Sequence, residues 1–103
     1  MESRLKLHEE LCNLLGSRNV YFQPPESKKL EYDCIIYNRN NILTQHANDK
    51  NLYIGHDRYE LIHIYKDPDS KLYRDFIREF QYCSLNRHFV SDNLYHDVFN
   101  LYY

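Results

Sequence analysis

The sequence contains no tryptophan and only two glycines, Gly16 and Gly55. A loop that cradles the phosphates of a nucleotide needs several glycines at close spacing, because only glycine lets the backbone approach so closely. Two glycines this far apart cannot form such a loop. The scarcity of glycine therefore weighs against nucleotide chemistry.

Cysteine is also scarce, and the three residues Cys12, Cys34 and Cys83 lie far apart in the sequence. Their number is odd and no C-x-x-C pair occurs, so the pattern predicts neither a disulfide framework nor a zinc ribbon. Reduced thiols in a cytosolic setting are the simplest interpretation.

Long apolar runs are missing as well. Charged residues recur through the first sixteen positions, which excludes the uninterrupted apolar stretch of a secretory signal. No other segment has the apolar length needed to cross a bilayer. We therefore expect a soluble protein that is made inside a cell and has no membrane partner.

An excess of charge of one sign is absent too. The sequence holds 13 Lys and Arg against 15 Asp and Glu, well mixed, with a formal net charge of −2. Without a basic stripe we expect no specific binding of nucleic acid. The hydrophobic content of 43% is typical of a folded protein, and 103 residues predict a single domain over 1–103.

Tyrosine, in contrast, is abundant, with eleven residues beside five phenylalanines. A tyrosine ring is apolar but ends in a polar hydroxyl, so this residue is enriched at protein interfaces. Aromatic residues are also favoured in ordinary β-strands. The composition therefore leaves both interpretations open.

Two segments have the apolar spacing of helices. The first covers residues 3–15 and ends at Gly16, a residue suited to the left-handed conformation just past a helix. The second is predicted to begin at Asp67-Pro68, because Asp caps free amides and Pro fits the first helical position. Their apolar faces consist of Leu7, Leu11, Leu14 and Leu15 in the first helix, and of Leu72, Tyr73, Phe76, Ile77 and Phe80 in the second.

The rest of the chain predicts strands and one long connection. Extended segments are expected at 32–43, 58–66, 82–90 and 95–103, with a minor strand at Val20. The polar residues 91–94 form a hairpin turn, and the polar stretch 44–57 forms a surface loop. The order α-β-β-α-β-β predicts an α+β fold, in which two helices pack on a mostly antiparallel sheet of four to five strands.

Six histidines invite a search for chemistry, and the predicted hairpin holds the densest group. A turn at 91–94 places His88 directly across from Asp97 and turns His96 to the opposite face. Two ligands on one face fall short of the three or four that zinc requires. His56 beside Asp57 has no nucleophile in a recognisable motif. We therefore predict no enzymatic activity and no cofactor, with a metal-dependent hydrolase on His88 and Asp97 as the weaker alternative.

Three strings of residues, taken in order, resemble a known family. They are NVYFQPP at 19–25, DPDS at 67–70, and a closing stretch that runs from RHF at 87–89 through DNLYHDVF at 92–99 to Tyr103. Together they resemble the tail terminator, or tail completion, proteins of bacteriophages with long non-contractile tails. The similarity extends over nearly the whole chain.

This resemblance implies a structural protein of the virion, located at the neck of the tail and assembled in the host cytoplasm. Such a protein caps the tail tube as a homo-oligomeric ring, usually of six copies, stops tube polymerisation and forms the surface for head-tail joining. Its partners are copies of itself, the tail tube protein and the head-tail connector or stopper protein, and the genome passes through the ring lumen. A head-completion or stopper role in the same neck remains an alternative.

A ring of identical subunits needs two different contact patches on each copy. We expect the loop 44–57 to reach a neighbouring subunit or the tube, with Tyr53 and His56 as its anchors, and one sheet edge to meet the next copy. The residues predicted for the subunit or tube interface are His46, Tyr53, His56, Arg58, Arg87 and His88.

Overall fold

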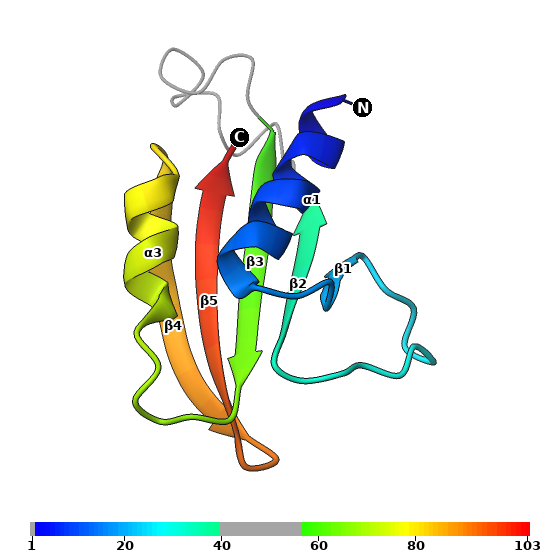
Figure 1. The fold of residues 1–103 in the computed structure, drawn as a ribbon, viewed down its shortest axis with the longest axis vertical. Helices are drawn as coiled ribbons and strands as arrows, with labels where there is room; N and C mark the ends of the chain where they lie inside the picture. The colour runs from blue at the N-terminus through cyan, green and yellow to red at the C-terminus, as the bar shows by residue number, and fades with distance from the viewer. Residues whose placement is uncertain (1, 40–56) are drawn as a thin grey trace.

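The computed structural model describes residues 2–39 and 57–103, which form two helices and a five-stranded mixed sheet (Figure 1). The predicted α+β class is confirmed. The observed order includes a strand at Val20 as a full member of the sheet, so three strands, instead of two, separate the helices. In chain order the elements are α1 (Glu2–Leu15), β1 (Val20–Phe22), β2 (Cys34–Arg39), β3 (Arg58–Tyr65), α3 (Leu72–Glu79), β4 (Cys83–Ser91) and β5 (Leu94–Tyr102).

The strands lie in the spatial order β1-β2-β3-β5-β4. β1 runs parallel to β2, whereas the other neighbours are antiparallel. Both helices cover the same face of the sheet (Figure 1), which we call the helix face; the other is the open face. Since β5 lies between β3 and β4, the edges of the sheet are β1 and β4.

Helix α1 follows the predicted leucine stripe. Leu7 and Leu11 have no exposed surface, and Leu14 and Leu15 pack against the same core. Gly16 ends the helix with φ of +81°, and its amide donates to the carbonyl of Cys12 at 2.9 Å. This left-handed stop is the one that the sequence predicted.

Helix α3 begins later than predicted. The amide of Asp69 donates to the side chain of Asp67 at 2.9 Å, and the amide of Ser70 to the carbonyl of Asp67 at 3.1 Å, so 67–70 forms a turn. The helix starts at Leu72, after Lys71, which provides no side-chain cap. Asp-Pro favours a hydrogen-bonded turn of the backbone, but here that turn is a β-turn and not the first turn of the helix.

The core lies between the helices and the sheet. Its largest members with almost no exposed surface include Tyr37, Tyr59, Phe76 and Phe99, and the Phe76 and Phe99 rings lie 4.7 Å apart. Ile77 was predicted to join them but is 43% exposed, because a surface helix, here of eight residues, buries only the stripe that faces the core. No helix in the described ranges has the length and apolarity required to cross a membrane.

Candidate functional site

The β4–β5 hairpin closes with a two-residue turn. Asp92 and Asn93 have φ of 54° and 64°, the left-handed values of the type I′ turn that matches the twist of a hairpin. Asn and Asp tolerate these values better than most residues. The predicted register is confirmed, with Val90 opposite Tyr95, Phe89 opposite His96 and His88 opposite Asp97.

Strand β4 forms a long, exposed edge of the sheet. It has nine residues and is paired with β5 alone among the described strands. From Ser84 onward every residue of β4 is exposed, including the apolar side chains of Leu85 (45%), Phe89 (36%) and Val90 (57%). An exposed apolar edge of this length is a template for pairing with another chain.

The opposite edge is much less accessible for pairing. β1 has only three residues and is followed closely by Pro24 and Pro25, which have no amide to donate. The outward-facing amide of Val20 already donates to the carbonyl of Arg18 at 2.8 Å, whereas the amide of Gln23 donates inward, to Tyr37 of β2, at 2.9 Å. The sheet therefore has one open edge and one nearly closed edge.

The direction of the unpaired backbone groups on β4 follows from the ladder. The amide of Tyr102 donates to the carbonyl of Tyr82 at 3.0 Å, and bonded and non-bonded pairs alternate from there along an antiparallel ladder. A bulge between Leu85 and Arg87 shifts this alternation. Following the register through the bulge, the residues that turn N–H and C=O away from β5 are Cys83, Leu85, His88 and Val90.

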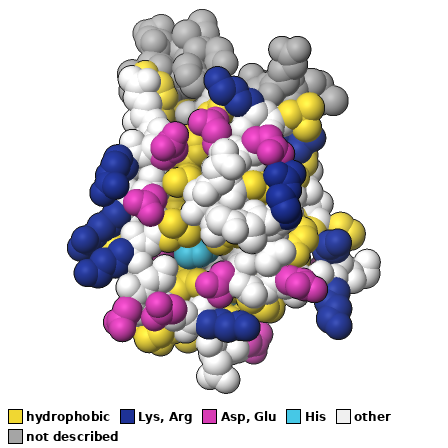
Figure 2. All heavy atoms as spheres, in the orientation of Figure 1, with side chains coloured by type: hydrophobic (Ala, Val, Ile, Leu, Met, Phe, Trp, Pro, Cys, Tyr) yellow, Lys and Arg dark blue, Asp and Glu magenta, His cyan; other side chains and the backbone are white. Residues whose placement is uncertain are grey.

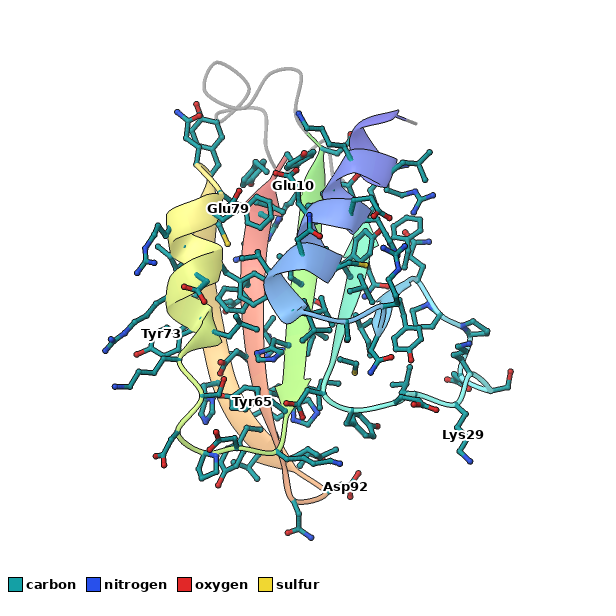
Figure 3. The ribbon with its side chains drawn as sticks, viewed as in Figure 1. Glu10, Lys29, Tyr65, Tyr73, Glu79 and Asp92 are labelled. Carbon is teal, nitrogen blue, oxygen red and sulfur yellow. The ribbon has the colours of Figure 1, made fainter. Side chains whose placement is uncertain are left out.

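On the helix face the hairpin holds a buried carboxylate. Asp97 is 4% exposed; its Oδ1 lies 2.5 Å from Nδ1 of His88, and its Oδ2 accepts from the hydroxyl of Tyr65 at 3.0 Å. An ionised carboxylate only accepts hydrogen bonds, so the imidazole donates. Burial, together with the neighbouring Asp97, raises the pKa of Tyr65. In Figure 3, Tyr65 lies toward the hairpin end of the sheet.

On the open face the hairpin carries an aromatic pair. The rings of Phe89 and His96 stack at 4.5 Å, and the guanidinium of Arg87 lies 5.7 Å from the centre of the Phe89 ring. Stacking and cation–π contacts of this kind stabilise a half-exposed aromatic side chain. Phe89 is therefore held in place while much of its surface stays accessible.

Truncation of His88 tests the buried carboxylate. His88→Ala removes the donor to Oδ1 of Asp97, and an unsatisfied buried acceptor costs about 1–2 kcal/mol of the free energy of unfolding. His88→Gln retains a donor and is expected to recover part of the loss. Urea denaturation measures both values, and an unchanged stability in His88→Ala would show that the contact contributes nothing.

The same contacts bear on the metal-dependent alternative. Asp97 already accepts hydrogen bonds from both His88 and Tyr65. Within 2–39 and 57–103, no group of three or more His, Cys, Asp or Glu side chains is arranged to hold a metal ion.

The structure separates the predicted interface residues. His46, Tyr53 and His56 lie outside the described residues. Arg58 begins β3 opposite Tyr102, at the end of the sheet away from the hairpin turn. Arg87 and His88 lie together on the exposed edge strand β4, on opposite faces of the sheet.

A hollow of about 410 Å³ lies where α1, the end of α3 and the end of β5 meet. Glu10 and Glu79 line it, side by side between the two helices in Figure 3. The hydroxyl of Tyr103 donates to Glu10. Burial is the main cause that raises the pKa of Tyr103, and this hydrogen bond is the second. The contact ties the end of β5 to α1, which is a structural role.

His63 lies on β3 under α3. It is 2% exposed, its Nδ1 has no hydrogen-bond partner among the residues that the structure describes, and its ring stacks on Tyr65 at 4.5 Å. Burial lowers the pKa of His63 to about 4. It lines a second hollow, of about 480 Å³, with charged residues of both signs. On this side of the molecule acidic and basic side chains are interspersed around the apolar strip between the helices (Figure 2).

Sequence reasoning missed the exposure of Leu85, Phe89 and Val90. Apolar residues on both faces of a strand are typical of a buried, central strand, whereas β4 is an edge. The only signal in the sequence was the hairpin itself, because a strand joined to its neighbour by a tight turn needs no second partner.

A comparison of the chain with models of protein families, with curated proteins and with solved structures found no match.

Proposed function

We propose that the protein is a structural assembly protein, a tail terminator that caps the phage tail tube as a ring of copies and forms the surface for head-tail joining. The observation that supports this most is the exposed edge of β4, nine residues long with three exposed apolar side chains. An edge of this kind binds by adding an extended segment to the sheet. Binding, and not catalysis, is its activity.

The difference between the two edges suits a closed assembly. If both edges of each sheet were open, subunits could join edge to edge without limit. A sheet with one open edge and one nearly closed edge cannot grow in this way. A terminator has to end a polymer, and its own surface must not start another one. The β4 edge is then one patch of the head-to-tail ring contact, and the second patch lies elsewhere on the subunit.

Electron microscopy of particles assembled without the protein tests the proposal. Loss of a terminator leaves the tube without a cap, so we expect tails of uncontrolled length that do not join heads. Adding back the purified protein should restore tails of fixed length. Tails of normal length that fail only to join heads would overturn the terminator role and assign the protein to the head-completion or stopper step.

A further inference from the structure

The open part of the β4 edge has its own pattern. Between the bulge and the turn, only His88 and Val90 turn their backbone N–H and C=O groups away from β5. Between them Phe89 points its side chain to the open face, where it stacks on His96. A strand that pairs here must therefore direct the backbone N–H and C=O groups of every second residue toward His88 and Val90.

A second copy of β4 meets this requirement in one register. Antiparallel pairing centred on Phe89 places His88 opposite Val90 of the second copy and Val90 opposite its His88, so outward-facing groups meet. Centring on His88 would place Val90 against the bulge at Asn86 and oppose two imidazoles. Centring on Val90 would place His88 against Asp92, where the turn has left the strand conformation.

The side chains of this register are complementary. The two Phe89 rings lie directly across from each other on the open face, and cross-strand aromatic pairs are favourable. Arg87 faces Ser91 of the second copy, one position from Asp92. Figure 3 shows Asp92 at the tip of the hairpin, directed away from the body of the molecule. Two Arg–Asp contacts related by the two-fold axis follow, and no like charges face each other.

From this pattern we propose that two copies close their β4 edges against each other, in a two-fold antiparallel pairing centred on Phe89. The inference rests on the proposed function in one respect: the dimer covers the edge that assembly uses, so it holds the free protein inactive. The paired segments, 87–91 of each copy, bury less than the roughly 1,200 Å² of a stable interface. We therefore expect a weak, reversible dimer that opens on contact with the tube.

Cross-linking tests the register. Phe89 belongs to a non-hydrogen-bonded pair across the two-fold axis, where Cα atoms lie about 4.5 Å apart, within the range of a disulfide. Phe89→Cys, oxidised with diamide, is expected to give a covalent dimer as two thiols lose two electrons and two protons to the reagent. Val90→Cys is the matched control. In this register Val90 lies diagonally across from Val90 of the second copy, and a distance of about 7–8 Å between the two residues is too long for a disulfide.

The native thiols do not interfere with this experiment. Cys12 and Cys34 are buried, and burial raises the pKa of the Cys83 thiol to about 12. Unsubstituted protein treated with diamide is therefore expected to stay uncrosslinked. Equal cross-linking of Phe89→Cys and Val90→Cys, or none at position 89, would overturn the register.

Sedimentation across a concentration series tests the dimer without a covalent bond. Phe89→Lys places two like charges opposite each other and is expected to weaken dimerisation at least about tenfold. Leu5→Lys, at a 53% exposed position on α1, is expected to leave it unchanged. If the protein is monomeric at every concentration but still fixes tail length, the dimer proposal is wrong and the proposed function stands. If the protein is dimeric but particles form tails of fixed length without it, the proposed function is wrong and the dimer stands.

Discussion

Phe76→Ala is expected to lower the free energy of unfolding by about 3–5 kcal/mol, the usual cost of removing a fully buried phenylalanine. Phe76 has no exposed surface and is the buried residue of α3. Its ring contacts Phe99 at 4.7 Å and His63 at 5.9 Å, so its removal leaves a cavity between helix and sheet. Because domains of this size are stable by only about 5–15 kcal/mol, the variant should be partly unfolded near physiological temperature.

The neighbouring residue provides the control for this prediction. Ile77 lies on the same helix but is 43% exposed, so Ile77→Ala is expected to cost less than about 1 kcal/mol. Both variants place alanine in the same helix, where it is a strong helix former, so the difference between their losses reports mainly the burial of Phe76. Chemical denaturation monitored by circular dichroism gives the two free energies. Equal losses would show that α3 is not anchored through Phe76.

Acid is expected to destabilise the protein through His63. Burial lowers the pKa of His63 from the usual 6.5 to about 4 in the folded state, despite the opposing effect of Asp97 and Asp33. Above pH 6.5 the imidazole is neutral in both states and the full stability is present. As the pH falls from 6.5 toward 4, the imidazole of His63 becomes protonated in the unfolded chain but stays neutral in the folded protein. At roughly 1.4 kcal/mol per pH unit, the loss approaches about 3 kcal/mol.

A variant that cannot titrate separates His63 from other groups. His63→Leu puts an apolar side chain of similar size in this buried position, so the stability of the variant should fall less between pH 7 and pH 4. The pKa of His8 is also lowered, chiefly by burial, and contributes to the acid sensitivity that remains. Urea denaturation at several pH values measures both slopes. The same slope in His63→Leu and in the unsubstituted protein would remove His63 as the cause.

Local patterns predicted much of this fold correctly. The leucine spacing fixed the buried face of α1, and Gly16 its end. The residues at 91–94 determined the hairpin register to the residue, because a two-residue turn leaves no freedom in pairing. From that register the contact between His88 and Asp97 followed directly.

Other features depend on contacts that the sequence does not display. Asp67-Pro68 is compatible with both a helix start and a turn, and the sequence does not show that the helix begins at Leu72, one turn before the buried Phe76. Hairpins show which strands are joined but not which one lies outermost. The exposure of β4, the main part of the candidate site, is a property of the whole sheet and so could not be predicted locally.

The placement of β5 also affects how the chain is made. Ribosomes synthesise β5 after β3 and β4, yet it lies between them and pairs with both along most of their length. Until β5 emerges, β3 has only β2 as a neighbour and β4 has none, so native folding waits for residues 94–102. Pairs such as Arg58 with Tyr102 are distant in sequence and therefore slow to form. Meanwhile the nascent chain exposes apolar strand segments, so its yield in cells should depend on chaperones that shield them.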